Sequence, residues 1–218
     1  MRRVWLALLL MFAGMAGARA AQPVTGDALL RSALARPAAQ LAKAQVLNGQ
    51  FTHRKHLPEI PKPLTATGEF VFARELGVYW HTQQPFDSVV VLTPGGILEK
   101  AEGAQTLHLS ADDQPAVRMI ANVFLALFTL DMASLERNFE LSTETPAKTG
   151  GWTIGLKPRS STIANVFVRA TVSGTTDVEQ VVLTDARGDR TVIDLTGISY
   201  SNAPPSAATR ALFAPASP

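Results

Sequence analysis

Apolar and polar residues alternate in short stretches through most of the chain, and prolines, glycines and charged residues separate these stretches. Alternation with a period of two, in stretches rich in β-branched and aromatic residues, is typical of strands with one buried face. The links between the stretches are short, and several hold glycine, so they predict hairpins. The strand-like stretches lie at residues 46–57, 68–74, 78–83 and 88–93, and they continue from 97 to 110 and from 139 to 201. We therefore expect a meander of about ten antiparallel strands.

The pattern changes to helical spacing at about residues 115–129. Apolar residues recur there three and four positions apart, which places them on one wide face of a helix. Ser110 and Asp113 form a variant capping box before this helix, and Pro115 suits its first turn. The apolar stripe consists of Met119, Ile120, Val123, Phe124, Leu127 and Phe128.

Two further helices and a tail complete the expected organisation. Residues 22–44 begin with helical spacing, although Pro37 should break or restart that helix, and residues 132–136 predict a second short helix after the long one. The tail at 202–218 is rich in proline and small residues, so we expect it to be flexible and loosely held. Residues 21–201 are then a single folded domain.

The first twenty residues have the layout of a secretory signal peptide. Arg2 and Arg3 precede an apolar run, and Ala18 and Ala20 supply the small residues that a cleavage site requires. The run has only about 15 residues, fewer than the roughly 20 that a bilayer-spanning helix needs, so a membrane anchor is the weaker interpretation. We expect cleavage after Ala20 and export of the remaining chain as a soluble protein.

Charge and cysteine content narrow the function further. The chain has 20 basic and 18 acidic residues, but three of the arginines lie in the signal peptide, so the remainder carries 17 basic and 18 acidic residues. Nothing in that balance favours a nucleic-acid partner. The chain has no cysteine, which excludes disulfides, thiolate metal sites, cysteine nucleophiles and lipid anchors attached through a thiol.

Catalytic and metal-binding motifs are also missing from the sequence. His53 and His56 are three residues apart in a predicted strand, where their side chains face opposite sides, so we expect solvated histidines and no metal site. The sequence has no serine elbow, phosphate loop or dinucleotide fingerprint. We expect no enzymatic activity and no cofactor.

Aromatic residues on the second and third strands leave two interpretations open. Phe70 and Phe72 alternate on one strand face, which Arg74 continues, and Trp80 lies on the partner strand. Pattern alone favours an ordinary closed core of sheet packed on helix. An arginine that continues an aromatic face is costly in such a core, and it favours instead an incompletely closed barrel with a helical lid over an apolar cavity. Arg74 could then latch the lid by bonding backbone carbonyls in one state and releasing them in another.

The same residues carry a resemblance to a known family. Gly68, Arg74 and Trp80 stand at six-residue intervals, followed by the pair Gln84-Pro85, and this arrangement resembles the LolA-type outer-membrane lipoprotein carriers. Gly49 and Phe51, in the strand that leads into the hairpin, extend the resemblance, which covers roughly residues 27–200. One departure is Glu75, since the family usually has proline directly after the arginine.

The resemblance implies an open antiparallel β-barrel with helices covering its mouth, in a monomeric periplasmic carrier. Acyl chains of lipoproteins would be received from an inner-membrane transporter and passed to an outer-membrane acceptor. The family's lid-latching arginine falls on Arg74 and its cavity tryptophan on Trp80. The cavity is expected to be lined by Phe70, Phe72, Trp80, Met119, Ile120, Val123, Phe124, Leu127 and Phe128.

Three hypotheses for the function follow. The first is a carrier of lipoprotein acyl chains, or of another lipid if the chain is a divergent member of the family. The second is a ligand-free accessory protein of an envelope assembly, with a filled barrel. The third, which the sequence favours least, is a hydrolase of envelope lipids.

Overall fold

A computed structural model of the protein describes residues 26–102, 104–144 and 150–214. The predicted signal peptide at residues 1–20 lies outside the described residues. Within them the chain forms eleven strands, one more than the number expected, and five helices. The strands are β1 (Val46–His56), β2 (Leu64–Ala73), β3 (Gly77–Gln84), β4 (Ser88–Thr93), β5 (Gly96–Ala101), β6 (Ala104–Ser110), β7 (Phe139–Thr143), β8 (Trp152–Pro158), β9 (Arg169–Gly174), β10 (Val178–Thr184) and β11 (Arg190–Ser201). The helices are α1 (Gly26–Leu41), α2 (Pro115–Thr129), α3 (Met132–Asn138), α4 (Ser161–Ala164) and α5 (Ala207–Phe213).

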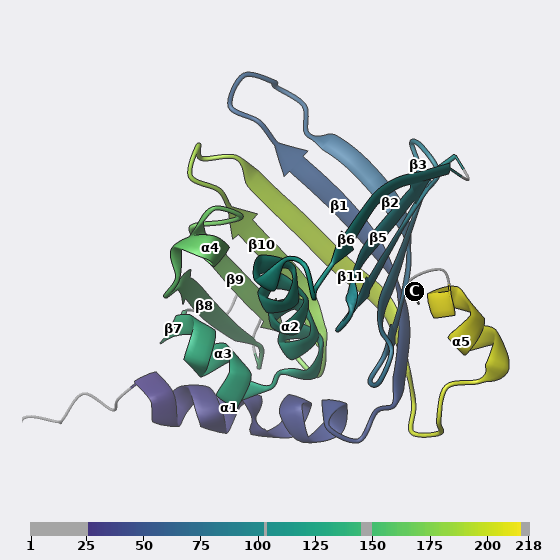
Figure 1. Ribbon diagram of the computed structural model, residues 1–218. Helices are drawn as coiled ribbons and strands as arrows, with labels where there is room; N and C mark the ends of the chain where they lie inside the picture. The colour runs from purple at the N-terminus through teal and green to yellow at the C-terminus, as the bar shows by residue number, and fades with distance from the viewer. Residues whose placement is uncertain (1–25, 103, 145–149, 215–218) are drawn as a thin grey trace, which may run out of the picture.

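All eleven strands belong to one antiparallel sheet that does not close. Their order is β6-β5-β4-β3-β2-β1-β11-β10-β9-β8-β7, so each strand neighbours the next in sequence except where β1 pairs with β11. The two edges, β6 and β7, are joined by the segment that contains α2 and α3. Figure 1 shows the sheet curving around α2, with α1 along its lower end. The prediction of an open antiparallel barrel with helices at its mouth is confirmed.

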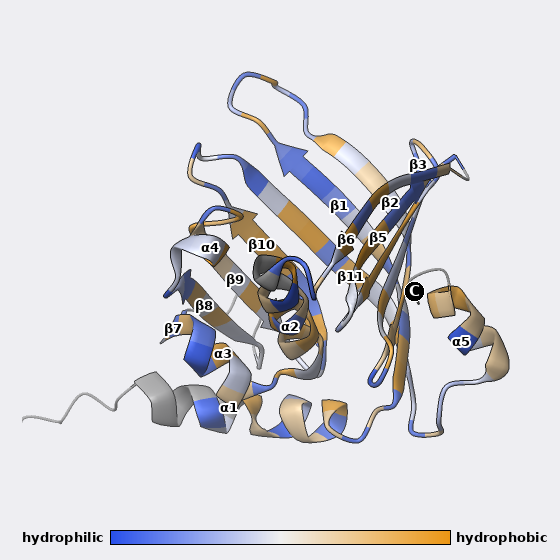
Figure 2. Cartoon of the chain, viewed as in Figure 1, coloured by the Kyte–Doolittle hydropathy of each residue, from blue (hydrophilic) through white to orange (hydrophobic). Residues whose placement is uncertain are grey.

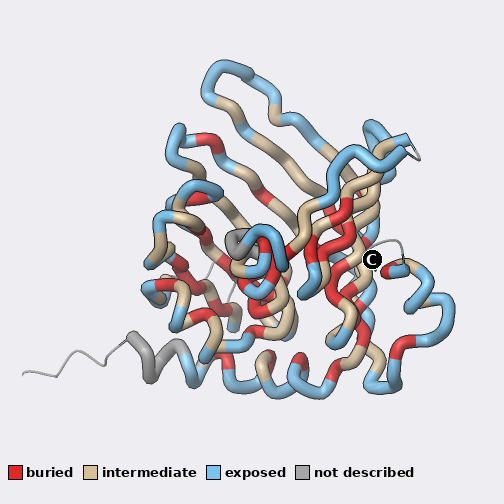
Figure 3. Tube along the Cα trace, viewed as in Figure 1, coloured by how far each residue is buried: buried red, intermediate tan, exposed pale blue. Residues whose placement is uncertain are grey.

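The sheet has two apolar faces, each covered by a helix. Alternate residues of a strand point to opposite faces, and the buried residues divide accordingly. Leu47, Phe51, Phe70 and Phe72 face inward toward α2, in the larger core. The outer face carries a smaller core, which consists of Val46, Ala73, Val91, Leu98 and Phe213. Figure 3 shows most of the buried segments in the lower half of the sheet and in α2, while the hairpin end between β1 and β2 at the top is exposed.

Helix α5 corrects the expectation of a loosely held tail. Residues 207–213 form a helix, Ser206 accepts a hydrogen bond from the backbone N–H of Thr209 at its start, and Phe213 is only 4% exposed. The expectation was wrong for these residues because a single aromatic side chain can fix a short helix when a matching apolar surface exists on the sheet. That surface is formed by residues far apart in the chain. Residues 215–218 lie outside the described part of the chain.

Two helix details also differ from the expectations. Helix α1 continues through Pro37 without a break, and the Pro37 ring is buried. Helix α2 has the predicted span, but Gln114 occupies its N-cap position and makes no side-chain cap. The Ser110 hydroxyl instead accepts a hydrogen bond from the backbone N–H of Asp112, and Asp112 pairs with Arg118. The predicted capping box is therefore a turn that precedes the helix.

Candidate functional site

Aromatic side chains from three adjacent strands meet on the inner face of the sheet. The register pairs Phe70 with Trp80, and it pairs Phe51 with Gly68, two residues before Phe70, so the three aromatic side chains form an oblique row across β1, β2 and β3. The rings of Phe51 and Trp80 stack with their centroids 3.8 Å apart, and those of Phe70 and Trp80 are 6.0 Å apart. Gly68 leaves room for the ring of Phe51, because a Cβ at this position would lie 2.9 Å from that ring and would also collide with the carbonyl of His81. The predicted cavity residues of β2 and β3 are thus brought together.

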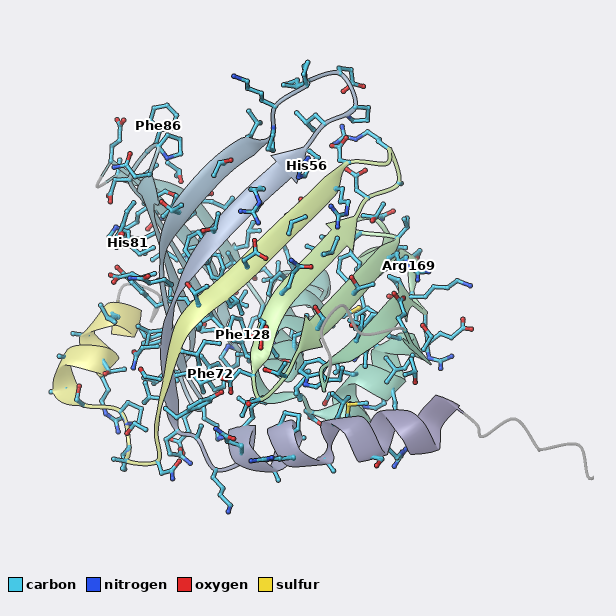
Figure 4. All side chains as sticks on the ribbon, turned by 180° about the vertical axis from the view of Figure 1, so that it is seen from behind. His56, Phe72, His81, Phe86, Phe128 and Arg169 are labelled. Carbon is cyan, nitrogen blue, oxygen red and sulfur yellow. The ribbon has the colours of Figure 1, made fainter. Side chains whose placement is uncertain are left out.

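Helix α2 turns most of its predicted stripe toward this row. Val123 and Leu127 are buried against the sheet, and Phe124 and Phe128 are partly buried. The ring of Phe128 lies 5.5 Å from that of Phe70 and 5.8 Å from that of Phe72, stacked on the latter. Figure 4 shows Phe72 and Phe128 side by side inside the sheet. The stripe therefore faces the inner face of the sheet and not solvent, as a lid requires.

Two residues of the stripe stand apart from the others. Met119 contacts α4, where its sulfur accepts a hydrogen bond from the hydroxyl of Ser160 at 3.6 Å. It lines a polar hollow on the other side of α2, together with Phe72 and Arg74, and not the apolar space under the helix. The side chain of Ile120 lies outside the described part of the structure.

Two apolar hollows remain between α2 and the sheet. We call them the larger hollow, of about 290 Å³, and the smaller hollow, of about 60 Å³. Both are bounded by Trp80, Phe124, Phe128 and Ile193. The larger hollow is completed by His53, Val78, Val90, Leu92 and Ile97. The smaller hollow is completed by Leu41, Leu47, Phe70, Val123, Leu127, Phe167, Val178, Val181, Leu183, Leu195, Ile198 and Tyr200.

More than two thirds of this lining was not among the predicted site residues. Strands β10 and β11 contribute Val181, Leu183 and Ile193 to the smaller hollow, while α1 contributes Leu41. The alternation within residues 178–184 indicates a strand with one apolar face, but it does not indicate which other strand that face opposes. The pairing of β1 with β11 joins residues about 140 positions apart and makes these side chains neighbours of Phe51.

Arg74 lies at the lower end of the inner face and bonds the end of α1. Its Nε donates to the carbonyl of Ala44 at 3.0 Å, and a terminal guanidinium nitrogen donates to the carbonyl of Leu41 at 2.6 Å. Leu41 is the last residue of α1, so its carbonyl has no partner within the helix and lies at the negative end of the helix dipole, and Ala44 lies three residues beyond it. The expected contact with helix carbonyls is thus present, and it is made to α1 and not to α2.

The histidines differ in their surroundings. His53 and His56 lie on opposite faces of β1, as expected, but His53 lines the larger hollow and is not simply solvated. Burial, together with the charge of Lys55, lowers the pKa of His53. On the outer face, His81 bonds Asp87 at 2.7 Å and Glu69 at 3.5 Å, and the hydrogen bond to Asp87 raises its pKa. No cluster of three potential metal ligands is found in the described parts of the chain.

The side chains that line the two hollows are suited to binding apolar groups. Among the described residues that line them, His53 and Tyr200 alone carry titratable side chains, and the Tyr200 hydroxyl is engaged with Asp177. A predominantly apolar pocket with one or two polar groups is typical of sites for small apolar ligands. No helix in the described residues is long and apolar enough to cross a membrane.

One family of known proteins matches most of this chain in sequence. A sequence model described as "Outer membrane lipoprotein carrier protein LolA" matches residues 42–209, which is more than three quarters of the chain. This match includes β1 to β11 and α2, and hence nearly all of the residues that line the hollows. No curated protein sequence matches.

Several solved structures are similar at low sequence identity. A LolA superfamily protein from Nitrosomonas europaea is 9% identical with a TM-score of 0.45, covering 80% of this chain and 94% of that one. The lipoprotein LppX of Mycobacterium tuberculosis is 12% identical with a TM-score of 0.42, covering 78% and 94%. LprF from Mycobacterium bovis is 9% identical with a TM-score of 0.35, covering 83% and 98%. The family assignment rests on the sequence match.

Proposed function

This chain belongs to the LolA family, and we propose from that premise that it is a periplasmic carrier of acyl chains. In this proposal the acyl chains of lipoproteins, or of related lipids, bind between α2 and the inner face of the sheet. The protein receives them from an inner-membrane transporter and delivers them to an outer-membrane acceptor. No bond is made or broken, and differences in affinity along the route give transfer its direction.

The observation that carries the proposal is the pair of apolar hollows beneath α2. A core that only stabilised the fold would be filled, because protein interiors are close-packed. Here the larger hollow of about 290 Å³ remains beside aromatic and aliphatic side chains. Burial of each methylene group contributes about 0.8 kcal/mol, so full burial of a sixteen-carbon chain contributes roughly 12 kcal/mol. That is ample for binding.

The proposal requires α2 to move. The smaller hollow of about 60 Å³ has the volume of roughly two water molecules at ~30 Å³ each, so an acyl chain can enter it only if α2 moves outward. Helix α2 lies in the segment that connects the two free sheet edges, where a shift breaks no strand pairing. In this account α2 is the lid, and its aromatic residues exchange contacts with the sheet for contacts with the ligand.

Arg74 stabilises the closed state through the end of α1. Leu41, the last residue of α1, lines the smaller hollow beside Leu127 of α2, so in this proposal the end of α1 closes the hollow together with α2. The two hydrogen bonds of Arg74 to this end involve a charged donor, and such bonds contribute roughly 1.5–3 kcal/mol each. Their sum is smaller than the contribution from burying a long acyl chain. The latch is therefore too weak to prevent binding, and because it lowers the free energy of the closed, empty state it assists release.

Mass spectrometry of ligands extracted from protein purified from its native envelope tests the proposal. Lipoprotein in the extract supports a lipoprotein carrier, and another acyl lipid supports a carrier of that lipid. Protein that is free of lipid, under conditions that retain acyl ligands on a known lipid carrier, contradicts the proposal. That result would favour a ligand-free accessory protein of the envelope.

A further inference from the structure

His53 is a polar residue in an otherwise apolar hollow. The other residues that line the larger hollow are aliphatic or aromatic. The side chain of His53 is half-buried, and among the described residues it has no hydrogen-bond or ion-pair partner. A polar group in such surroundings is costly unless it is hydrogen-bonded. Its bonding capacity is therefore available to a molecule that occupies the hollow.

The strand register places His53 at the upper end of this hollow. Trp80 pairs with Phe70 and Val90, and Val78 pairs with Phe72 and Leu92, one step nearer α1. In the opposite direction, Phe51 pairs with Gly68 and His53 pairs with Ala66. The larger hollow thus runs from aliphatic residues at its α1 end, past Trp80, to the imidazole.

Beyond His53 the inner face becomes polar. Lys55, the next inward residue of β1, forms an ion pair with Asp189 at 3.3 Å. The upper part of β1 is hydrophilic in Figure 2, whereas the inner strands below it and α2 carry most of the hydrophobic residues. A ligand with an apolar tail and a polar head would match this gradient only with its tail toward α1.

The protonation state of His53 decides which head group suits it. Burial and, to a smaller extent, the nearby charge of Lys55 lower its pKa. Lys55 pairs with Asp189. Asp194, which follows the β11 partner of His53, pairs with Arg54. The imidazole is therefore neutral at pH 7, with one nitrogen as donor and the other as acceptor. A neutral N–H donor suits a neutral carbonyl oxygen. A phosphate or carboxylate would be bound better by a cationic side chain.

We propose that His53 binds the ester carbonyl of an acyl chain whose hydrocarbon tail occupies the larger hollow. This inference rests on the proposed function and adds to it a ligand chemistry and an orientation: an acyl ester with its tail toward Val78 and Leu92 and its ester at the rim. Acyl esters are shared by the diacylglyceryl group of lipoproteins and by phospholipids.

The test compares two ligands that differ only at the carbonyl. The ester ligand is 1-palmitoylglycerol and its ether counterpart is 1-hexadecylglycerol, and their dissociation constants are measured by calorimetry on the purified protein without its signal peptide at pH 7. A single hydrogen bond corresponds to a difference of about three- to tenfold. We expect the wild-type protein to bind the ester tighter than the ether by this factor.

Two variants separate the role of His53 from general effects on the strand. His53→Leu should bind both ligands equally and should bind the ether at least as well as the wild type does. His56→Leu changes a histidine three residues further along on the opposite face of β1, and it should keep the ester preference. An ester preference that persists in His53→Leu, or is absent from the wild type, overturns the inference.

The outcome also distinguishes this inference from the proposed function. If the wild type binds both ligands without preference, the role of His53 is refuted and the carrier proposal stands. If it binds neither ligand, the carrier proposal fails as well. Displacement of bound 1-hexadecylglycerol, whose binding does not depend on His53, by a dipalmitoyl lipopeptide and by a dipalmitoyl phospholipid then identifies the source. At least one of the two should displace it more weakly from His53→Leu, and loss of this dependence for both contradicts the inference.

Discussion

Arg74 and the end of α1 form a contact between an arginine and backbone alone. The carbonyls of Leu41 and Ala44 accept its two hydrogen bonds, and no carboxylate is within bonding distance among the described residues. An arginine that ends an aromatic strand face can be recognised from sequence, because the two-residue alternation of the strand places it on the same face as the aromatic residues. Its partners cannot, because they lie at and just beyond the end of α1, about thirty residues earlier in the chain.

Replacement of Arg74 by leucine should slow the release of cargo more than it affects loading. The apolar side chain keeps the hollows apolar, but the closed state loses two hydrogen bonds, so the bound state is relatively favoured. The measurement is a two-step assay, with loading from donor membranes followed by discharge to the acceptor. We expect discharge to slow by at least tenfold, since the loss of about 1.4 kcal/mol corresponds to that factor. Arg74→Lys should recover part of the rate.

Arg31→Leu is the matched control for this assay. Arg31 lies in α1 and forms an exposed ion pair with Glu136 at 2.8 Å, and such pairs contribute little. Its removal should leave both steps unchanged. Normal discharge by the Arg74→Leu protein would refute the latch.

His81 on the outer face should have a raised pKa that depends on Asp87. The hydrogen bond from its Nε2 to Asp87 is the largest cause of the shift, and the longer contact to Glu69 adds to it. Because the folded state holds the proton more tightly, this stabilisation is complete below pH ~6.5 and is lost as the pH rises through the raised pKa. NMR titration of Asp87→Asn should show the pKa of His81 moving down toward its ordinary value.

Stability measurements give a second readout of the same pair. The difference in unfolding free energy between the wild type and Asp87→Asn should be greater at pH 5.5 than at pH 8.5. Glu69→Gln should have a smaller effect on both the pKa and this difference, because its contact is 3.5 Å long. A difference that grows with pH would contradict the assignment.

At the scale of single elements, helix α5 functions as a cover for the outer face. Its anchor, Phe213, packs with Val46, Ala73, Val91 and Leu98, which come from four different strands. Figure 1 shows α5 on the side of the sheet opposite to α2. The helix therefore stabilises the sheet without access to the hollows.

Replacement of Phe213 by alanine should destabilise the protein without altering ligand binding. The expected loss in unfolding free energy is about 3 kcal/mol, at the lower end for a buried phenylalanine, because a terminal helix can relax around the change. Urea denaturation measures this loss, and Ala211→Ser on the exposed side of α5 is the control. A loss below about 0.5 kcal/mol would show that α5 does not stabilise the sheet.

Local patterns account for the elements that sequence predicts well. The span of α2 follows from its apolar stripe, and the hairpin of β2 and β3 follows from Gly77 and the alternation on either side. Pro37 shows the limit of local rules: a proline in a helix costs about 3 kcal/mol, yet α1 continues through it with the ring buried. Packing of α1 under the sheet overrides the local preference.

At the scale of the whole molecule, the site is built by pairing of distant segments. The meander from β1 to β6 is set by short links, and so is the meander from β7 to β11. The pairing of β1 with β11 then joins the two halves into one curved sheet. Because this pairing has no local signal, the sequence predicted the wall that contains Phe70 and Trp80 but not the wall formed by β10 and β11.

The same topology explains why α2 covers the site. Strands β6 and β7 are the free edges of the sheet, and the chain must pass from one to the other. The connection includes the amphipathic helix α2, whose apolar face is buried only if it packs against the inner face. A lid over an apolar cavity is thus the consequence of an open sheet and an amphipathic connection.

Quenching of Trp80 fluorescence by a brominated acyl chain tests most directly whether this cavity binds lipid. Bromine quenches tryptophan only at contact, and in a Trp152→Phe protein that lacks residues 1–20 Trp80 is the sole tryptophan. Titration with 9,10-dibromostearate should quench its fluorescence saturably, and unbrominated stearate should reverse the quenching. If the protein binds the brominated chain, as measured by calorimetry, while the fluorescence of Trp80 stays unchanged, the acyl chain does not occupy the space between α2 and the sheet.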